Sequence, residues 1–250
     1  MINFEGELHI EDSLIKQLTE EKSQWTLKKD IHTVEDLWNN FRDILVRHNK
    51  EIFDQNPLTD NEFKQVQNQL RFPTSYDAAK WLMGENGIAR VKIVREDASL
   101  RVVRPVVFKR ADIAGGSTVY QVVHQIQVEK LSKIYPNRRG DVTLLMNGLP
   151  MIHIELKNRN HPYMDAFRQI KKYLKEGVFR DIFSTLQMFV VSNGTDTRYI
   201  AAANEDGLNS KFLSAWLDDE NKPVTNYLPF ARDVLSIPAA HRMVSQYTVL

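Results

Sequence analysis

The sequence predicts an α/β protein in which helices flank a mixed sheet core and a helical elaboration near the N-terminus packs on that core. Three observations favour this class. Apolar residues in the first third of the chain recur with a helical period. Short runs rich in β-branched residues follow, as is typical of strands. Between residues 120 and 192 the predicted order becomes strand, strand, helix, strand, which is typical of an α/β core.

Helices account for the N-terminal third. Leu37 and Phe41 belong to the apolar stripe of a helix over 33–49. Thr59 is followed three residues later by Glu62, the spacing of a capping box, which predicts the start of another helix. The predicted helices span 10–24, 33–49, 59–69 and 75–83, and the elaboration extends over about 30–85.

Strands and one further helix make up the rest. The dipeptide Asn147-Gly148 predicts a hairpin, because both residues accept the left-handed conformation of a tight turn. We expect one domain over 1–250, with its core at about 110–203 plus the first helix, and a C-terminal segment over 207–250. Besides the hairpin, the predicted strands cover 88–95, 101–108, 120–127, 187–191 and 197–202, and the predicted helix covers 164–174.

Three charged residues of the hairpin are candidates for a functional site. Glu155 and Lys157 lie two residues apart in the second strand, so they emerge on the same face. Asp141 begins the first strand. Two carboxylates and an ammonium that converge on a sheet can hold a hard divalent cation and orient a water, as phosphodiester hydrolysis requires. His153 lies on the same face, where we expect a half-buried strand residue and not a metal ligand.

The register of the hairpin decides whether Asp141 joins this group. A plain two-residue turn at Asn147-Gly148 would place Asp141 opposite Ile154, on the wrong face. A position opposite Glu155 needs a three-residue loop or a bulge, which Gly148 would permit. We therefore predict that the hairpin is not a plain two-residue turn.

Weaker alternatives exist for each motif. Glu-Xaa-Lys at a strand end arises often by chance and is then a solvated strand face. Gln169 and Tyr173 lie four residues apart on one side of the 164–174 helix. Taken alone, they would be an amide at the edge of the buried stripe and a half-buried tyrosine. Because the charged strand comes just before them, we expect them to support the site or to hydrogen-bond a DNA backbone.

Positive charge is concentrated around the candidate site. The whole chain has a formal charge of +1, but residues 129–180 contain eleven Lys or Arg against five Asp or Glu. This distribution is typical of contact with a polyanion. Some of these lysines coat the solvent face of a helix. Arg138, Arg139 and Arg159 are better candidates, because they flank the strands that carry the carboxylates.

Composition excludes several classes of protein. The chain has no cysteine, which excludes a disulfide framework and cysteine-based zinc or nucleophile chemistry and fits a reducing cytoplasm. The sequence contains neither a signal-peptide pattern nor an apolar run long enough to span a membrane. The phosphate-binding loop motif of ATPases is absent too.

These motifs together resemble a known family. The run Arg139-Gly-Asp141, then Asn147-Gly-Leu-Pro150 and Ile154-Glu-Leu-Lys-Asn158, is similar to the PD-(D/E)xK nuclease core. More narrowly, it resembles the N-terminal endonuclease domain of the R subunit of type I restriction enzymes. Gln169-Ile-Lys-Lys-Tyr173 matches that family's Gln-Xaa-Xaa-Xaa-Tyr motif, and Glu11 matches a glutamate on its first helix. One departure is Gly140, where the family often has proline.

The resemblance implies a restriction-endonuclease-like sheet and Mg²⁺-dependent cleavage of double-stranded DNA, with Mn²⁺ as a possible substitute. The implied metal ligands are Asp141, Glu155 and the carbonyl of Leu156, with Glu11 as an outer ligand. Lys157 would orient the attacking water or offset charge on the phosphate.

In that family the full-length R subunit uses ATP and assembles with methylation and specificity subunits in the cytoplasm. This chain ends before any ATP-binding motor, which suggests a piece of a longer protein. Two alternatives stay open at this point: a stand-alone nuclease with the same core, and a DNA-binding or assembly module with a vestigial site.

Overall fold

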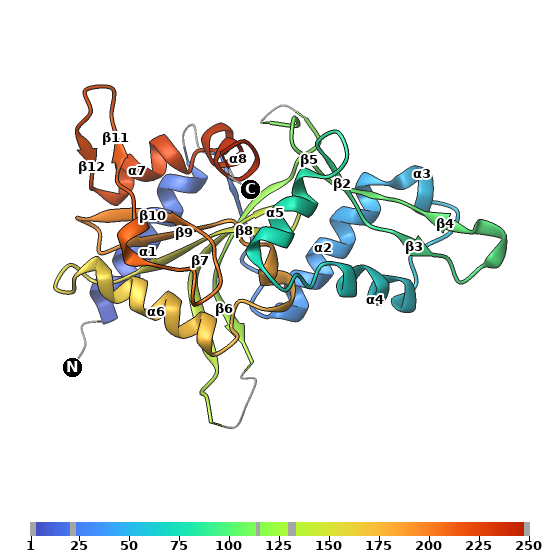
Figure 1. The fold of residues 1–250 in the computed structure, drawn as a ribbon, viewed down its shortest axis with the longest axis horizontal. Coiled ribbons are helices and arrows are strands. Elements are labelled where there is room, and N and C mark those ends of the chain that lie inside the picture. Colours follow the sequence, from blue (N-terminus) through green and yellow to red (C-terminus); the bar gives the residue numbers. More distant parts are fainter. Residues whose placement is uncertain (1–3, 21–23, 114–115, 130–133, 248–250) are drawn as a thin grey trace.

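A mixed sheet of six strands forms the centre of the protein in the computed structural model, which describes residues 4–20, 24–113, 116–129 and 134–247. The strand order is β1-β6-β7-β8-β9-β10 (Figure 1). β1 is parallel to β6 and β8 is parallel to β9, whereas the other neighbours are antiparallel. The strands are β1 Thr26–Leu27, β6 Tyr120–Val128, β7 Arg138–Met146, β8 Leu149–Leu156, β9 Met188–Ser192 and β10 Thr197–Ala201. The prediction of a mixed α/β protein is confirmed.

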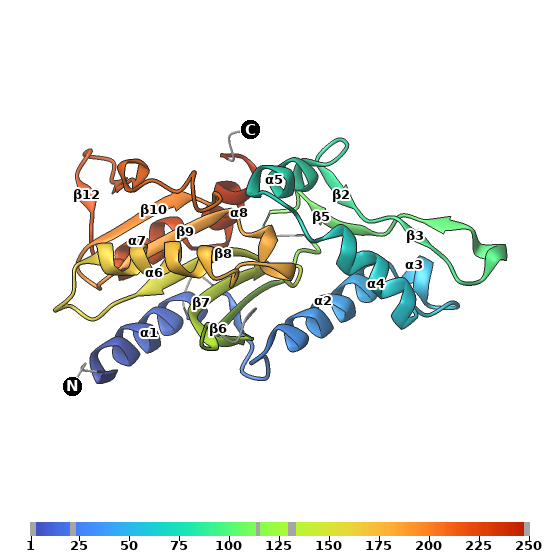
Figure 2. The ribbon, with the colours of Figure 1, turned by 60° about the horizontal axis from the view of Figure 1, so that its bottom comes forward.

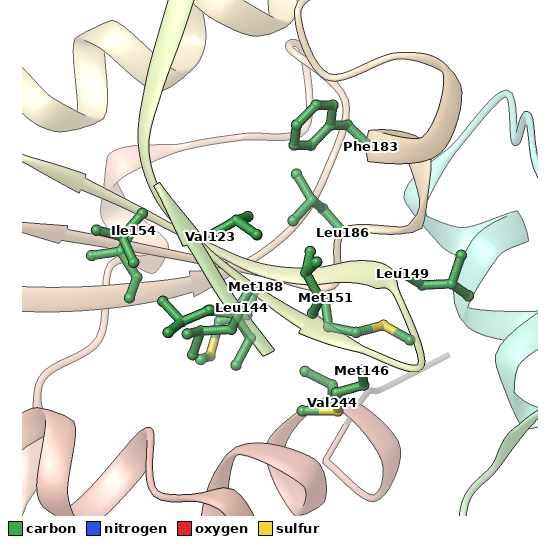
Figure 3. Packing of buried hydrophobic residues seen from close by; sticks show 14 of the residues in the cluster. Val123, Leu144, Met146, Leu149, Met151, Ile154, Phe183, Leu186, Met188 and Val244 are labelled. Atoms are coloured by element: carbon green, nitrogen blue, oxygen red, sulfur yellow. The ribbon is translucent and has the colours of Figure 1, made fainter. Parts of the chain in front are cut away.

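Helices lie on both sides of this sheet. Figure 2 shows α6 on one side of β7 and β8, and α1 on the other. In Figure 3 Phe183 and Leu186 approach the strands from the first side, and Val244 of α8 approaches from the second. These helices are α1 Phe4–Thr19, α6 Tyr163–Lys175, α7 Tyr227–Val234 and α8 Ile237–Ser245, with a short 3-10 helix, η2, at Asp181–Thr185.

The first helix begins earlier than predicted. α1 starts at Phe4 and ends at Thr19, whereas the sequence predicted 10–24. Glu7 lies in the first turn, where its carboxylate interacts favourably with the positive end of the helix dipole. Residues 21–23, in the predicted last turn, lie outside the described residues. None of the helices among the described residues is both long enough and apolar enough to cross a membrane.

The elaboration is helical as predicted, and it continues into a β arm that projects away from the central sheet (Figure 1). Capping boxes at Thr33–Asp36 and Thr59–Glu62 start two of its helices, which confirms the predicted cap at Thr59. Pro105 separates β4 from β5, because proline has no N–H to donate to the ladder. The elements are α2 Val34–His48, α3 Lys50–Phe53, α4 Asp60–Gln69, α5 Ser75–Met83, β2 Ile88–Arg90, β3 Ile93–Val94, η1 Ala98–Leu100, β4 Val102–Val103 and β5 Val106–Lys109.

The C-terminal segment packs back onto the core. The indole Nε1 of Trp25 donates to the carbonyl of Leu235, 2.7 Å away, and joins the start of the sheet to the region between α7 and α8. Before α7, the chain forms a small hairpin that the sequence did not predict. Its elements are η3 Ser210–Phe212, β11 Trp216–Leu217 and β12 Pro223–Val224.

The β7–β8 hairpin has the register that the candidate site requires. Asn147 and Gly148 have φ values of 52° and 79° and form a two-residue loop, since Met146 pairs with Leu149. The turn itself is therefore plain, contrary to the expectation, but the register that brings Asp141 opposite Glu155 is reached through a bulge, the other expected route. The shift arises within β8, where Met151 is an extra residue: Leu145 pairs with Pro150, but Leu144 pairs with Ile152. This bulge brings Asp141 level with Glu155.

Strand β8 is buried on both faces, unlike the strand with one open face that its alternating pattern suggested. All eight of its residues are buried. β7 and β9 flank it, and α6 and η2 cover the face that carries His153 and Glu155. Glu155, within this strand, and Lys157, just after it, therefore lie at the border between the core and a cleft.

Candidate active site

Asp141, Leu156 and Lys157 line a cleft of about 490 Å³ where β7 begins and β8 ends, and Glu155 lies buried beside them. The wall on one side comes from α1, through Glu7 and Glu11. The other wall comes from α6 and the residue His161 before it. Asp141 and Lys157 line the floor between them. Glu7, Glu11 and Asp141 are thus held by a helix or a strand, whereas Lys157 and His161 lie in the loop between β8 and α6.

Asp141, Glu155 and Lys157 come together as predicted. The Asp141 Oδ2 atom accepts a hydrogen bond of 2.7 Å from the backbone N–H of Leu156, next to Glu155. The Lys157 Nζ atom lies 3.6 Å from Glu155 Oε1 and donates to the Leu156 carbonyl at 2.8 Å. The bulge at Met151 is what places the three groups on one side of the sheet.

Burial makes the carboxyl groups of Asp141 and Glu155 weaker acids than usual. Loss of hydration, followed by repulsion from Glu155, raises the pKa of Asp141 well above its ordinary value. Loss of hydration likewise raises the pKa of Glu155 to about 8, although the Lys157 ammonium opposes this shift. A bound divalent cation would offset the repulsion between these two carboxylates and so favour their ionised forms.

The donor atoms suit a hard cation. Glu155 Oε1 is buried and has no hydrogen-bond partner among the described residues, and Asp141 Oδ2 is already occupied by a backbone N–H. The described residues contain no cluster of three His, Cys, Asp or Glu side chains arranged to hold a metal. The available protein ligands are therefore two carboxylates and the Leu156 carbonyl. A set this small fits Mg²⁺, which usually keeps several waters or substrate phosphates.

Glu11 lies in the cleft, but both of its carboxylate oxygens are engaged. Oε1 is 2.8 Å from His124 Nδ1, and Oε2 accepts a hydrogen bond from Gln125 Nε2. Gln125 lies opposite Asp141 in β6 with a φ of 55°, a strained conformation for this residue type. Glu7, one turn earlier on α1, lines the same cleft and was not among the predicted site residues.

Gln169 and Tyr173 support the strands that carry the site. Gln169 lines the cleft and donates to the Tyr173 hydroxyl at 2.6 Å. The Tyr173 hydroxyl donates to the carbonyl of Arg139 at 3.3 Å, two residues before Asp141. Tyr173 is buried, so its ring packs in the core and only Gln169 faces the cleft. A supporting role fits this geometry better than a grip on DNA does for Tyr173.

The three predicted DNA-contacting arginines have different environments. Arg139 is exposed and lines the cleft. Arg138 forms two hydrogen bonds of 2.6 and 2.7 Å with the Glu176 carboxylate, so its guanidinium already has an anionic partner within the protein, and its contact with DNA stays a prediction. Arg159 is exposed and does not line the cleft. Lys130 and Lys133, part of the basic segment, lie outside the described residues.

His153 is a residue that the sequence reasoning undervalued. Its side chain is 1% exposed, and its Nε2 atom lies 3.2 Å from Glu155 Oε2. Burial lowers the pKa of this imidazole to about 4, so the ring is neutral. Its spacing of two residues from Glu155 could have indicated the contact, because alternate strand residues share a face.

Comparisons with known proteins identify a family and several relatives of this chain. A family model described as the type I restriction enzyme R protein N terminus matches residues 6–207. The endonuclease subunit of type I restriction enzyme SauMSSORF170P from Staphylococcus aureus (strain MSSA476) is 28% identical over 248 residues, which cover 99% of this chain and 25% of the relative. That of SsaAORF53P from Staphylococcus saprophyticus is 29% identical over 249 residues, with the same coverages. That of EcoprrI from Escherichia coli is 43% identical over 95 residues, or 37% of this chain and 30% of the relative.

This chain spans about a quarter of the length of the staphylococcal relatives. The family match extends over most of the chain and includes the six strands of the central sheet, the residues that line the cleft, and α6. The chain therefore belongs to the family of type I restriction enzyme R protein N termini.

Proposed function

We propose that this chain is a metal-dependent endonuclease unit with a PD-(D/E)xK site on a restriction-endonuclease-like sheet, and that it hydrolyses phosphodiester bonds of double-stranded DNA. One observation carries the proposal. The buried Glu155 Oε1 atom has no hydrogen-bond partner among the described residues, and it lies 3.6 Å from the ammonium of Lys157, which lines the cleft together with Asp141. Such an atom costs free energy unless it gains a ligand.

Asp141, Glu155 and the Leu156 carbonyl would hold Mg²⁺ or Mn²⁺. When bound, the cation would polarise the scissile phosphate and lower the pKa of a coordinated water. Lys157 would orient the attacking water or offset charge on the phosphoryl oxygens, because its ammonium group lies 3.6 Å from Glu155. Arg139, exposed at the rim, would contact a backbone phosphate.

Glu11 would assist from outside the metal's ligand shell. His124 and Gln125 already occupy its two oxygens, so it would act through water or through the local field. Gln169 and Tyr173 would hold the start of β7 in place. These assignments leave Asp141, Glu155 and Lys157 as the groups nearest the chemistry.

The wider setting follows from the relatives. Because they are called endonuclease subunits of type I restriction enzymes, we infer that this chain serves within such a complex. The partners would be DNA and the methylation and specificity subunits. Within such a complex, ATP would be bound by other parts of the enzyme, because these 250 residues contain no phosphate-binding loop motif.

Plasmid nicking tests the proposed function. The wild-type chain is incubated with supercoiled DNA and Mg²⁺ or Mn²⁺, beside Glu155→Gln and Lys157→Ala, and Mn²⁺ binding is measured by calorimetry. We expect each substitution to slow nicking by roughly a hundredfold or more. Glu220→Gln is the matched control, because Glu220 is exposed on the small C-terminal hairpin.

Two outcomes would count against the proposal. In the first, Lys157→Ala keeps wild-type nicking. In the second, the wild-type chain neither nicks DNA nor binds Mn²⁺. Circular dichroism of each variant excludes unfolding as the reason for lost activity.

A further inference from the structure

Three polar groups form a buried chain that ends on Glu155. Thr143 Oγ1 lies 3.0 Å from His153 Nδ1, and His153 Nε2 lies 3.2 Å from Glu155 Oε2. Thr143 and His153 are paired directly across β7 and β8. All three side chains are at most 3% exposed. The chain therefore occupies the core behind the cleft, out of reach of DNA.

The surroundings of the imidazole fix its position. The ring packs against Phe179 at a centroid distance of 5.0 Å and against Phe189 at 6.4 Å. On its other side lies Gly140, where an added Cβ would be 2.9 Å from His153 Cε1. A side chain at position 140 would thus displace the ring. Gly140 is therefore the residue that leaves room for His153.

The proton positions follow from the partners. Full burial favours a neutral imidazole, which has a single N–H. An ionised carboxylate can only accept, so in the cation-binding state Nε2 must carry the proton and donate it to Glu155 Oε2. Nδ1 is then an acceptor, and the Thr143 hydroxyl donates to it. This arrangement satisfies Oε2 and leaves Oε1 on the side of Lys157, which lines the cleft.

We propose that His153, held by Thr143 and accommodated by Gly140, is a positioning residue that fixes the Glu155 carboxylate so that Oε1 faces the metal. The inference rests on the proposed function. Hydrogen bonds behind metal ligands typically change metal affinity by about 10- to 100-fold. His153 touches neither substrate nor metal in this scheme, so its effect is on the geometry and affinity of the metal site.

Two substitutions of His153 by residues with a side-chain amide test the proposal, with Mn²⁺ binding to the full chain measured by calorimetry. In His153→Gln the side-chain amide nitrogen is as many bonds from Cβ as Nε2 is, so it can still donate to Glu155. In His153→Asn the amide is one bond shorter and reaches only toward Thr143. We expect His153→Gln to bind Mn²⁺ within about threefold of wild type and His153→Asn to bind about 10- to 100-fold more weakly.

The outcomes separate the two proposals. If Mn²⁺ affinity depends on Asp141 but both His153 variants bind like wild type, or both weaken equally, the positioning role is wrong while the metal site stands. If wild type binds no Mn²⁺, and Asp141→Asn changes nothing, the proposed function falls and the positioning role falls with it.

A second measurement does not depend on the folding of those variants. Nitrogen-15 NMR of the Mg²⁺-saturated wild-type chain reports which His153 nitrogen is protonated. We expect the Nε2–H form, and Thr143→Val, which keeps the side-chain shape, should perturb the Nδ1 signal. An Nδ1–H form in the wild type would overturn the proposal.

Discussion

Glu155 is a carboxyl group at a position where ionisation is costly. Its side chain is fully buried, and loss of hydration raises its pKa from 4.5 to about 8. Without a cation, the folded protein therefore keeps a proton there that the unfolded chain releases at a lower pH. The sign of the linkage follows: stability is highest below about pH 4.5 for this group and falls as pH rises through about 8.

This linkage gives a stability prediction at the residue scale. In the presence of a chelator, the wild-type chain should lose roughly 2–5 kcal/mol of unfolding free energy between about pH 5 and about pH 9, since one pKa unit corresponds to about 1.4 kcal/mol. Glu155→Gln has no charge to bury and should lose much less. Urea unfolding at both pH values measures this. Equal pH dependence in the two proteins would contradict it, and added Mg²⁺ should restore stability to wild type alone.

At the scale of elements, the β7–β8 hairpin packs on the elaboration through its turn. Gly148 has a φ of 79°, and an added Cβ would lie 2.8 Å from the Phe41 Cα atom of α2. Gly87 has a similar φ of 76°, but its added Cβ would make only an ordinary contact of 3.4 Å with Arg110. The pair separates the cost of the left-handed backbone from the cost of a backbone clash.

We predict that Gly148→Ala destabilises the protein more than Gly87→Ala does. The left-handed conformation costs each alanine about 1–2 kcal/mol, and Gly148→Ala adds overpacking of about 1–3 kcal/mol. Urea midpoints of both variants measure the difference. If the two midpoints coincide, α2 does not restrain the turn.

Local patterns in the sequence predicted the elements well, but not their long-range partners. The capping box at Thr59 and the Asn147-Gly148 turn follow from neighbouring residues, and both are present. β1 was missed because it has two residues and pairs with β6 far along the chain. The position of the bulge, at Met151, could not be predicted, because buried residues on both faces of β8 give no sign of a one-residue shift in register.

The same limit applied to the site. Asp141, Glu155 and Lys157 could be chosen from motif and spacing. The roles of Arg138 and His153 depend on Glu176 and Thr143, whose positions are set by the tertiary fold. Sequence therefore identified the charged groups of the cleft, and the structure identified their buried partners.

For the molecule as a whole, one continuous hydrophobic cluster joins the sheet, the elaboration and the C-terminal helices. It includes Trp25, beside β1, and Trp38, on α2, which are 2% and 6% exposed. A shared core makes these three parts depend on each other for stability, because none of them can unfold without exposing apolar surface of the others.

We therefore predict a single cooperative unfolding transition. Variants that retain only Trp25 or only Trp38, with the remaining tryptophans replaced by phenylalanine, should give the same urea midpoint by fluorescence. Far-ultraviolet circular dichroism of each variant should give that midpoint as well. Separate midpoints for the two fluorophores would mean that the elaboration unfolds independently.

The unequal arms of the hairpin have a consequence for how relatives can differ in length. β8 has one more residue than β7 between the turn and the paired carboxylates, and Met151 is that surplus. Removing one residue between Pro150 and His153 would straighten the strand and still leave Asp141 beside Glu155. Removing one from β7 would widen the mismatch. Natural deletions in this family should therefore accumulate in the second arm and be rare in the first.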